Sequence, residues 1–253
     1  QLVENGSREI TLLGQNVNAY KFGKKKLSDL IYSLNEIKEL DRIRYTSSHP
    51  NDVTPDLITS HKDCKKLMPL LHLPVQSGSN NILEKMGRKH TVEQYIEITQ
   101  KLKKVRPEIK FSSDFIISFP DETEKDFNDS INLLQNIKFI NTYSFIYSSR
   151  PGTPASKLSE ISRFISKKRL IKFQEEASKI KKNYKKSLMG TFTRVLFENK
   201  VDDQNYFGRD EFFNSVIVKS KKDIIGKVKN VRLEQCNQNT LFGELVQNNQ
   251  KEN

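Results

Sequence analysis

Small polar residues directly follow an apolar run in the first part of the chain, and their types suit ligand binding. Residues 67–75 are apolar at nearly every position, and Gln76, Ser77, Gly78 and Ser79 come next. Amide and hydroxyl side chains can donate and accept hydrogen bonds, as a polar ligand requires. A run without alternation is typical of a parallel strand buried on both faces. The polar cluster then lies at the carboxyl end of the strand, where α/β proteins bind ligands.

The same arrangement recurs in four other places within residues 1–155. Each time, a segment of strand-type residues ends in glycine, amide, hydroxyl or charged residues. The segments and the polar stretches after them are 9–13 with 14–16, 42–45 with 46–50, 109–117 with 118–123, and 140–147 with 148–152.

Helical patterns separate these five strand segments. They cover residues 27–40, 55–60, 80–86, 92–105 and 124–136. Strands that alternate with helices indicate βαβ crossovers and a parallel sheet. A complete eight-unit barrel needs about 250 residues. The predicted fold class of residues 1–155 is therefore α/β, a partial parallel (β/α) barrel.

Residues 156–188 have a different composition, which predicts one long basic connecting helix. This stretch contains eleven Lys or Arg and three Glu. A contact with phosphate would explain the one-sided charge, and a solvated charged face would explain it equally well. The candidate RNA-binding residues of this helix are Lys181, Lys182, Lys185 and Lys186.

Residues 189–247 have an all-β pattern. Strand-type residues fill 191–197, 213–219, 228–234 and 241–246. Short strands with glycine-marked turns are typical of a small barrel that binds oligonucleotides. Aromatic residues among cations suit base stacking beside phosphate neutralisation, although phenylalanines also fill barrel cores. The candidates here are Arg209, Phe212, Lys221 and Lys222, and residues 248–253 are predicted to be disordered.

Charge and cysteine content narrow the function classes. The 253 residues include 43 Lys or Arg against 31 Asp or Glu, a formal net charge of +12 that favours a nucleic-acid partner. No apolar run reaches the roughly 18 residues of a membrane span, so we expect no membrane partner. Cys64 and Cys236 lie far apart, which excludes a disulfide framework. With no visible signal peptide, we predict a cytoplasmic location. The sequence does not give the oligomeric state, and we expect a monomer.

Short motifs occur in order along nearly the whole chain. They are LLGQNVNAY (12–20), SSHP (47–50), LPVQSGS (73–79), MGRKHT (86–91), SDFII (113–117), YSSRPGTPA (147–155), GRD (208–210) and LFGEL (241–245). With this set the first part resembles the radical S-adenosylmethionine (SAM) enzymes, specifically the tRNA methylthiotransferases of the MiaB type. The C-terminal part, with the last two motifs, resembles a TRAM domain.

The resemblance implies a fold, a reaction and cofactors. The fold would be a radical SAM barrel followed by the TRAM barrel. A reduced [4Fe–4S] cluster would cleave SAM to a 5′-deoxyadenosyl radical, which abstracts hydrogen from C2 of N6-isopentenyladenosine next to the tRNA anticodon. A methylthio group is then added. The cofactors would be SAM and [4Fe–4S] clusters, and the sulfur donor stays unknown.

The resemblance also implies SAM-binding roles at the strand ends. Gln15 and Asn16 could contact the ammonium or the carboxylate, and the Arg88 guanidinium could pair with the carboxylate. We expect Gln76 and Ser77 to contact the ribose of SAM, and Ser48 and Asp114 to support the residues that contact SAM. Tyr147 could stack on adenine or on the substrate base. For each of these residues the alternative is a structural role, in which its polar group is hydrogen-bonded within a loop or a helix cap.

The chain departs from the family pattern in two ways. The family's C-x-x-x-C-x-x-C cluster motif is absent, and Cys64 and Cys236 match no cluster cysteines. Because the chain starts at Gln1, with a helix-end pattern capped by Gly6, we interpret it as N-terminally truncated, with the first strand and the cluster loop missing. The cluster ligands would lie outside it, and the fragment alone would be inert. Ser118 and Asp121 also stand where the family usually has glycine.

Two alternatives remain open from the sequence. One is a sibling enzyme that methylthiolates threonylcarbamoyladenosine in tRNA or a ribosomal protein aspartate. The other is a non-catalytic RNA-binding protein made of a degenerate barrel and a TRAM domain. The motifs 16–20 and 147–155 favour the isopentenyladenosine enzyme.

Overall fold

The computed structural model describes residues 1–246, so the predicted disordered tail lies outside the described residues. The chain divides into two compact units. One contains residues 1–10, 38–42 and the chain from 182 onward, and the other contains 11–37 and 43–181.

The second unit is built on a parallel sheet, and β6 is its central strand. Asp114 of β6 pairs with Tyr143 of β7, and Phe111 of β6 pairs with Leu71 of β5. An isolated parallel bridge joins Ile43 to Leu67. The strands are β5 (Leu70–His72), β6 (Lys110–Ile117) and β7 (Asn141–Ile146), and β4 (Arg42–Tyr45) pairs with β1 (Glu9–Leu12).

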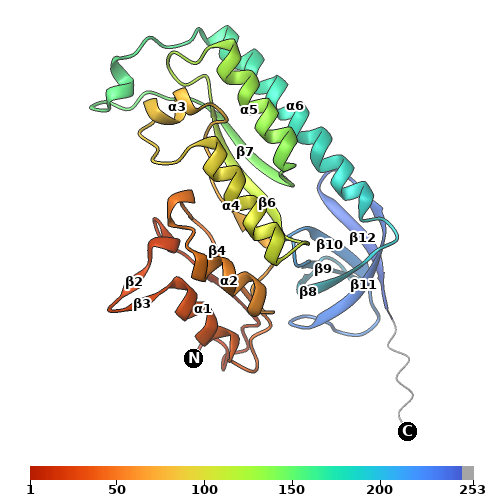
Figure 1. Cartoon of the computed structure of the whole chain (residues 1–253). Helices are drawn as coiled ribbons and strands as arrows, with labels where there is room; N and C mark the ends of the chain where they lie inside the picture. The colour runs from red at the N-terminus through yellow and green to blue at the C-terminus, as the bar shows by residue number, and fades with distance from the viewer. Residues whose placement is uncertain (247–253) are drawn as a thin grey trace. The chain divides into compact units, whose positions relative to one another are not determined.

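Helices alternate with these strands, as the sequence pattern predicts. Thr91 and Thr123 each cap a helix by accepting a backbone N–H bond from the third helical residue. The apolar side of α5 is buried, and α5 runs beside α6 (Figure 1). The helices are α1 (Leu27–Asn35), α2 (Pro55–Asp63), α3 (Asn80–Lys85), α4 (Val92–Val105), α5 (Glu124–Ile137) and α6 (Arg163–Ser187).

The two faces of the β5-β6-β7 sheet differ in exposure. Residues that face the helices, such as Leu71 and Phe115, are fully buried. On the opposite face of β7, Tyr143 is 55% exposed and Phe145 is 60% exposed. The sequence predicts burial on both faces only for the strand at 67–75, and there Leu71 is buried while Leu70 and His72 are half-buried, so that prediction is wrong for β5.

The first unit contains a closed five-stranded barrel with the strand order β10-β12-β11-β8-β9. Its core consists of buried aliphatic and aromatic side chains, including Val195, Phe197, Val216 and Leu233. The strands are β8 (Phe192–Lys200), β9 (Asn205–Arg209), β10 (Ser215–Lys219), β11 (Val228–Cys236) and β12 (Thr240–Leu245).

Several element bounds differ from the prediction. The basic helix α6 begins at Arg163, and only a short 3-10 turn, Pro154–Lys157, precedes it. Residues 2–6 are turns, and they have the bonds of the predicted glycine-capped helix end: the Ser7 N–H donates to the Leu2 carbonyl at 3.1 Å, the Gly6 N–H donates to the Val3 carbonyl at 2.9 Å, and Gly6 has φ 94°. The sequence reading also missed β9 and the small hairpin of β2 (Lys21–Phe22) and β3 (Lys25–Lys26). The predicted domain bounds 1–155, 156–188 and 189–247 stay predictions.

Candidate functional site

Three residues at successive strand ends have left-handed backbones. Ser47 follows β4 with φ 64°, Gln76 follows β5 with φ 75°, and Ser118 follows β6 with φ 58°. A non-glycine residue in this region costs about 1–3 kcal/mol and persists only where its surroundings impose it. Such strain is concentrated in functional sites, so these strand ends form the candidate site.

Gln76, Arg88 and Asp114 come together at this edge of the sheet. The Gln76 N–H donates to the Asp114 carbonyl at 3.0 Å, and the Gln76 carbonyl accepts from the Ile116 N–H at 2.9 Å. Burial lowers the pKa of the Arg88 guanidinium, and the nearby Asp114 carboxylate opposes that shift. A guanidinium so placed can hold the carboxylate of a ligand.

Loops that follow β1 and β4 are bonded to one another. The Asn16 amide donates to the Asp52 carboxylate at 2.7 Å. Asn18 and the backbone of His49 exchange two bonds of 2.8 Å each. The Asn51 amide donates to the Lys89 carbonyl at 3.1 Å, next to Arg88. These bonds hold the polar strand ends in one place.

Two predicted SAM contacts, Ser48 and Tyr147, carry buried hydroxyl groups that lack a hydrogen-bond partner within the described residues. The buried Ser118 hydroxyl also lacks one there. Each such group costs about 1–3 kcal/mol when it is left unsatisfied. Tyr147 packs its ring edge against Phe119, with the centroids 5.0 Å apart. A polar ligand such as SAM fits here, because its oxygen and nitrogen atoms would satisfy these hydroxyls.

The remaining predicted SAM contacts lie differently. Gln15 is exposed beside Asn16. The Ser77 hydroxyl is buried, lies 3.4 Å from the Ser130 hydroxyl of α5 and accepts from the Ser79 N–H. Ser77 is thus turned toward the helices. All eight assignments stay predictions.

The sequence reading missed residues on the open face of the sheet. The His72 imidazole lies 3.4 Å from the Asp114 carboxylate, and its ring meets that of Tyr143 edge-on at 5.9 Å. Phe145 is two positions beyond Tyr143 on the same face of β7. The alternation of aromatic and polar residues in 141–146 could have indicated Tyr143 and Phe145. That prediction would have required knowing which face of the sheet the helices leave open.

Comparison with known proteins identifies the family. The model of the Radical SAM superfamily matches residues 1–134, more than half of the 253 residues, and the model of the TRAM domain matches residues 186–246. The chain belongs to the radical SAM superfamily. Its predicted fold class and TRAM barrel are thereby confirmed.

Several curated relatives of this radical SAM protein are named tRNA-2-methylthio-N(6)-dimethylallyladenosine synthase. The protein of Pelagibacter ubique is 51% identical over 99% of this chain and 57% of its own length. That of Wolbachia pipientis is 45% identical over 96% of this chain and 57% of its own length. The chain thus spans a little over half the length of these relatives.

A solved structure supports the fold. Coproporphyrinogen III oxidase from Escherichia coli, described as a radical SAM enzyme, aligns with a TM-score of 0.53 at 12% identity. The alignment covers 81% of this chain and 54% of that chain.

The radical SAM part offers no cluster ligands within residues 1–246. No group of three or more His, Cys, Asp or Glu side chains there could hold a metal ion. Burial raises the pKa of the Cys64 thiol to about 11, so this thiol is unsuited to be a thiolate ligand. Cys64 and Cys236 also belong to different units. The cysteines present therefore do not fit a [4Fe–4S] cluster.

A buried histidine lies beside the strand ends of this radical SAM protein. Burial, together with the nearby His49 and Arg88, lowers the pKa of His90 to about 4. The rings of His49 and His90 lie 5.6 Å apart. His90 is therefore neutral at pH 7, and it adds no positive charge next to Arg88.

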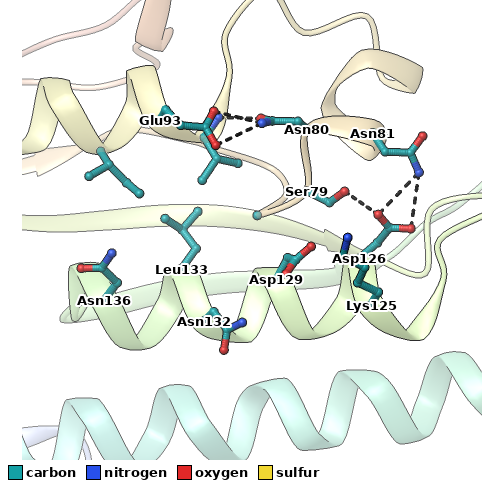
Figure 2. A pocket seen from close by; sticks show the side chains of 13 residues that line it. Ser79, Asn80, Asn81, Glu93, Lys125, Asp126, Asp129, Asn132, Leu133 and Asn136 are labelled. Atoms are coloured by element: carbon teal, nitrogen blue, oxygen red, sulfur yellow. Dashed lines mark hydrogen bonds between the residues drawn. The ribbon is translucent and has the colours of Figure 1, made fainter.

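A cavity of about 530 Å³ lies among α3, α4 and α5 (Figure 2). Ser79 donates to Asp126 at 2.5 Å, and Asn80 donates to both oxygens of Glu93 at 2.9 and 3.2 Å. These bonds join the start of α3 to α4 and α5. The Ser79, Asn80, Glu93 and Asp126 side chains of the lining are thus already hydrogen-bonded within the protein.

The turn after β6 contains Ser118 and Asp121, the two residues that stand where the family resemblance implies glycine. Ser118 has φ 58° and Asp121 has φ 61°, so the turn keeps the left-handed backbone that glycine adopts without strain. The Ser118 N–H donates to Glu122 at 3.0 Å. Arg169 of α6 donates to the same carboxylate oxygen at 2.9 Å.

Replacing Ser118 with glycine should stabilise the protein by about 1 kcal/mol. The change removes backbone strain and an unpartnered buried hydroxyl, which together outweigh the extra chain entropy of glycine of about 0.5–1 kcal/mol. Urea denaturation of Ser118→Gly and of the parent protein measures the difference. A less stable variant would contradict this account of the turn.

The predicted RNA-binding lysines of α6 differ in exposure. Burial lowers the pKa of Lys181, and Lys185 is buried and donates to the Gln238 carbonyl at 2.9 Å. Lys182 and Lys186 are exposed. The barrel candidates differ too: Lys221 and Lys222 are exposed, and Phe212 is half-buried. These RNA-binding assignments also stay predictions.

Proposed function

We propose that this chain is part of a radical SAM methylthiotransferase that acts on C2 of N6-isopentenyladenosine, next to the anticodon of tRNA. The observation that carries the proposal is the 51% identity, over 99% of the chain, to a relative named for that product. The TRAM match and the net charge of +12 support tRNA as the partner. No helix within residues 1–246 is long and apolar enough to cross a membrane. We further propose a cytoplasmic monomer.

SAM would bind at the carboxyl ends of β4, β5 and β6. Arg88 would pair with its carboxylate, since a guanidinium presents a bidentate fork. The unpartnered hydroxyls of Ser48 and Tyr147 would bond to its polar atoms. When bound with its cluster, SAM supplies the radical chemistry, and the residues of this chain bind and orient it.

The cluster ligands would lie outside this chain. The two cysteines do not fit a cluster, and the curated relatives extend well beyond the part that the chain matches. We therefore assign no step of cluster chemistry to residues of this chain.

The open face of the sheet would receive the substrate nucleoside. Tyr143 and Phe145 offer two exposed ring surfaces on one side of β7. In the register of the sheet Ile116 pairs with Phe145, and Asp114 pairs with Tyr143. This face is thus apolar at one end and polar at the other. An adenine with an apolar N6 substituent matches this gradient.

Arg88→Ala should weaken SAM binding by about ten- to a hundredfold, because loss of a charge-assisted hydrogen bond costs roughly 1.5–3 kcal/mol. Calorimetry on the complete, cluster-loaded protein measures the affinity. The exposed neighbour Lys89→Ala is the matched control and should bind SAM normally. Equal affinities of both variants and the parent would assign Arg88 a structural role.

The complete protein, reconstituted with iron and sulfide and supplied with SAM and reductant, should methylthiolate only tRNA that carries isopentenyladenosine. Nucleoside mass spectrometry after digestion detects the product. tRNA with threonylcarbamoyladenosine and unmodified tRNA are the comparison substrates. A product on threonylcarbamoyladenosine would favour the sibling enzyme. Tight tRNA binding without any SAM cleavage would favour the non-catalytic RNA-binding protein.

A further inference from the structure

Phe213 has a backbone conformation that is rare for an aromatic residue. It lies in the turn between β9 and β10 with φ 63°, in the left-handed region. Its side chain is 43% exposed. Glycine or asparagine would form this turn with less strain. Stability alone therefore does not account for a phenylalanine at this position.

The turn is held in place by several groups of the same unit. One Asp210 carboxylate oxygen accepts from the backbone N–H groups of Phe212 at 2.9 Å and Asn214 at 2.8 Å. The Asn214 amide bonds to the other oxygen at 2.8 Å. Arg42 donates to the carbonyls of Arg209 at 2.8 Å and Asp210 at 3.3 Å. A strained residue persists where its surroundings fix it in this way.

An arginine lies against the Phe213 ring. The Arg209 guanidinium is 4.2 Å from the ring centroid of Phe213 and 5.3 Å from that of Phe207. The same side chain lies 3.7 Å from the Glu198 carboxylate, which keeps it oriented along the barrel surface. The guanidinium lies over one face of the Phe213 ring, and the side chain stays 43% exposed, so a base would stack on the exposed remainder of the ring.

We propose that Phe213, with Arg209 over one face of its ring, is a stacking platform for one unpaired nucleobase of the RNA that this barrel would bind. The inference rests on the proposed function and deepens it by naming the residue and the chemical group. Every base has a π-face that can stack on an aromatic ring, and that face is accessible only when the base is unpaired. The strained turn holds the ring at the barrel surface, where a relaxed turn residue would offer no ring.

The decisive variant is Phe213→Gly in the complete protein. Glycine removes the ring and relieves the strain, so we expect an unchanged or higher melting temperature together with weaker RNA binding. The loss for a hairpin RNA with an unpaired loop should be about five- to a hundredfold, the value of one stacked base. Fluorescence anisotropy at about 50 and 200 mM salt should give an unchanged salt dependence, because no charge is lost.

Three comparisons complete the experiment. Phe213→Tyr keeps the ring and should retain affinity. Phe164→Leu removes an exposed ring of α6, where Lys168 lies 4.3 Å from the ring, and should leave RNA binding unchanged. A fully paired duplex RNA should bind the parent protein and Phe213→Gly with equal affinity.

The outcomes separate this proposal from the proposed function. If the parent protein binds the hairpin and Phe213→Gly binds it equally well, the stacking platform is wrong and the proposed function stands. An equal loss for hairpin and duplex also overturns base stacking. If the parent protein binds neither RNA at low salt, the RNA-binding role fails, and the platform fails with it.

Discussion

Replacing Arg169 with alanine should lower the free energy of unfolding by about 3–5 kcal/mol, because it leaves a buried carboxylate without its cation. Arg169 and Glu122 are bonded at 2.9 Å, with side-chain exposures of 10% and 1%. Urea denaturation of Arg169→Ala measures the loss. Glu122→Gln combined with Arg169→Met removes both charges, and it should recover part of the stability. If this double variant is no more stable than Arg169→Ala, the loss does not come from the unpaired carboxylate.

The penalty in Arg169→Ala should depend on pH. Burial is the main cause that raises the pKa of Glu122 to about 7, and Arg169 opposes that shift. A carboxyl whose folded pKa is raised favours folding below its unfolded pKa, and this contribution is lost as pH rises through about 7. We therefore expect the destabilisation in Arg169→Ala to be larger at pH 8 than at pH 5. Glu122→Gln should remove this dependence.

Gly78→Ala should destabilise the second unit by about 3 kcal/mol. A β-carbon on Gly78 would lie 2.5 Å from the Asp129 carbonyl oxygen and 2.5 Å from the Ser130 α-carbon. Both atoms belong to the backbone of α5, which cannot move aside as a side chain can. Thermal unfolding followed by circular dichroism, together with urea denaturation, measures the change.

Gly87→Ala is the matched control for Gly78→Ala. Gly87 has φ 70°, but a β-carbon there meets no atom within 4 Å. Gly87→Ala should lower the free energy of unfolding by only about 1 kcal/mol, the strain of an alanine with a left-handed backbone. Equal losses in both variants would show that helix packing against Gly78 is not the cause.

Periodicity and capping residues were enough to predict most helices of the second unit. Helix α4 has the predicted bounds, 92–105, because Thr91 and the apolar spacing mark both its ends. Strand β5 is shorter than predicted, with three residues in place of 67–75. Apolar composition reports burial, but it does not report which residues form ladder hydrogen bonds.

Side-chain direction was the part of the site that the sequence could not supply. Adjacent residues such as Phe212 and Phe213 look equivalent in sequence, but Phe213 has a left-handed backbone and an exposed ring, while Phe212 is half-buried. Lys182 and Lys185 are both basic residues of α6, but Lys185 is buried against the Gln238 carbonyl. The SAM-binding assignments of Gln76 and Asp114 came from the family resemblance and from their strand positions, and they stay predictions.

The strand order of the barrel has a consequence for its synthesis. The strand β12 comes last along the sequence, but it pairs with β10 on one side and β11 on the other. Until β12 leaves the ribosome, β10 and β11 each keep an unpaired edge, and exposed edges recruit other chains. Closure of this barrel is therefore a late event that must follow translation of residues 240–245. A nascent chain stalled before residue 240 would expose two unpaired strand edges that can pair with other chains.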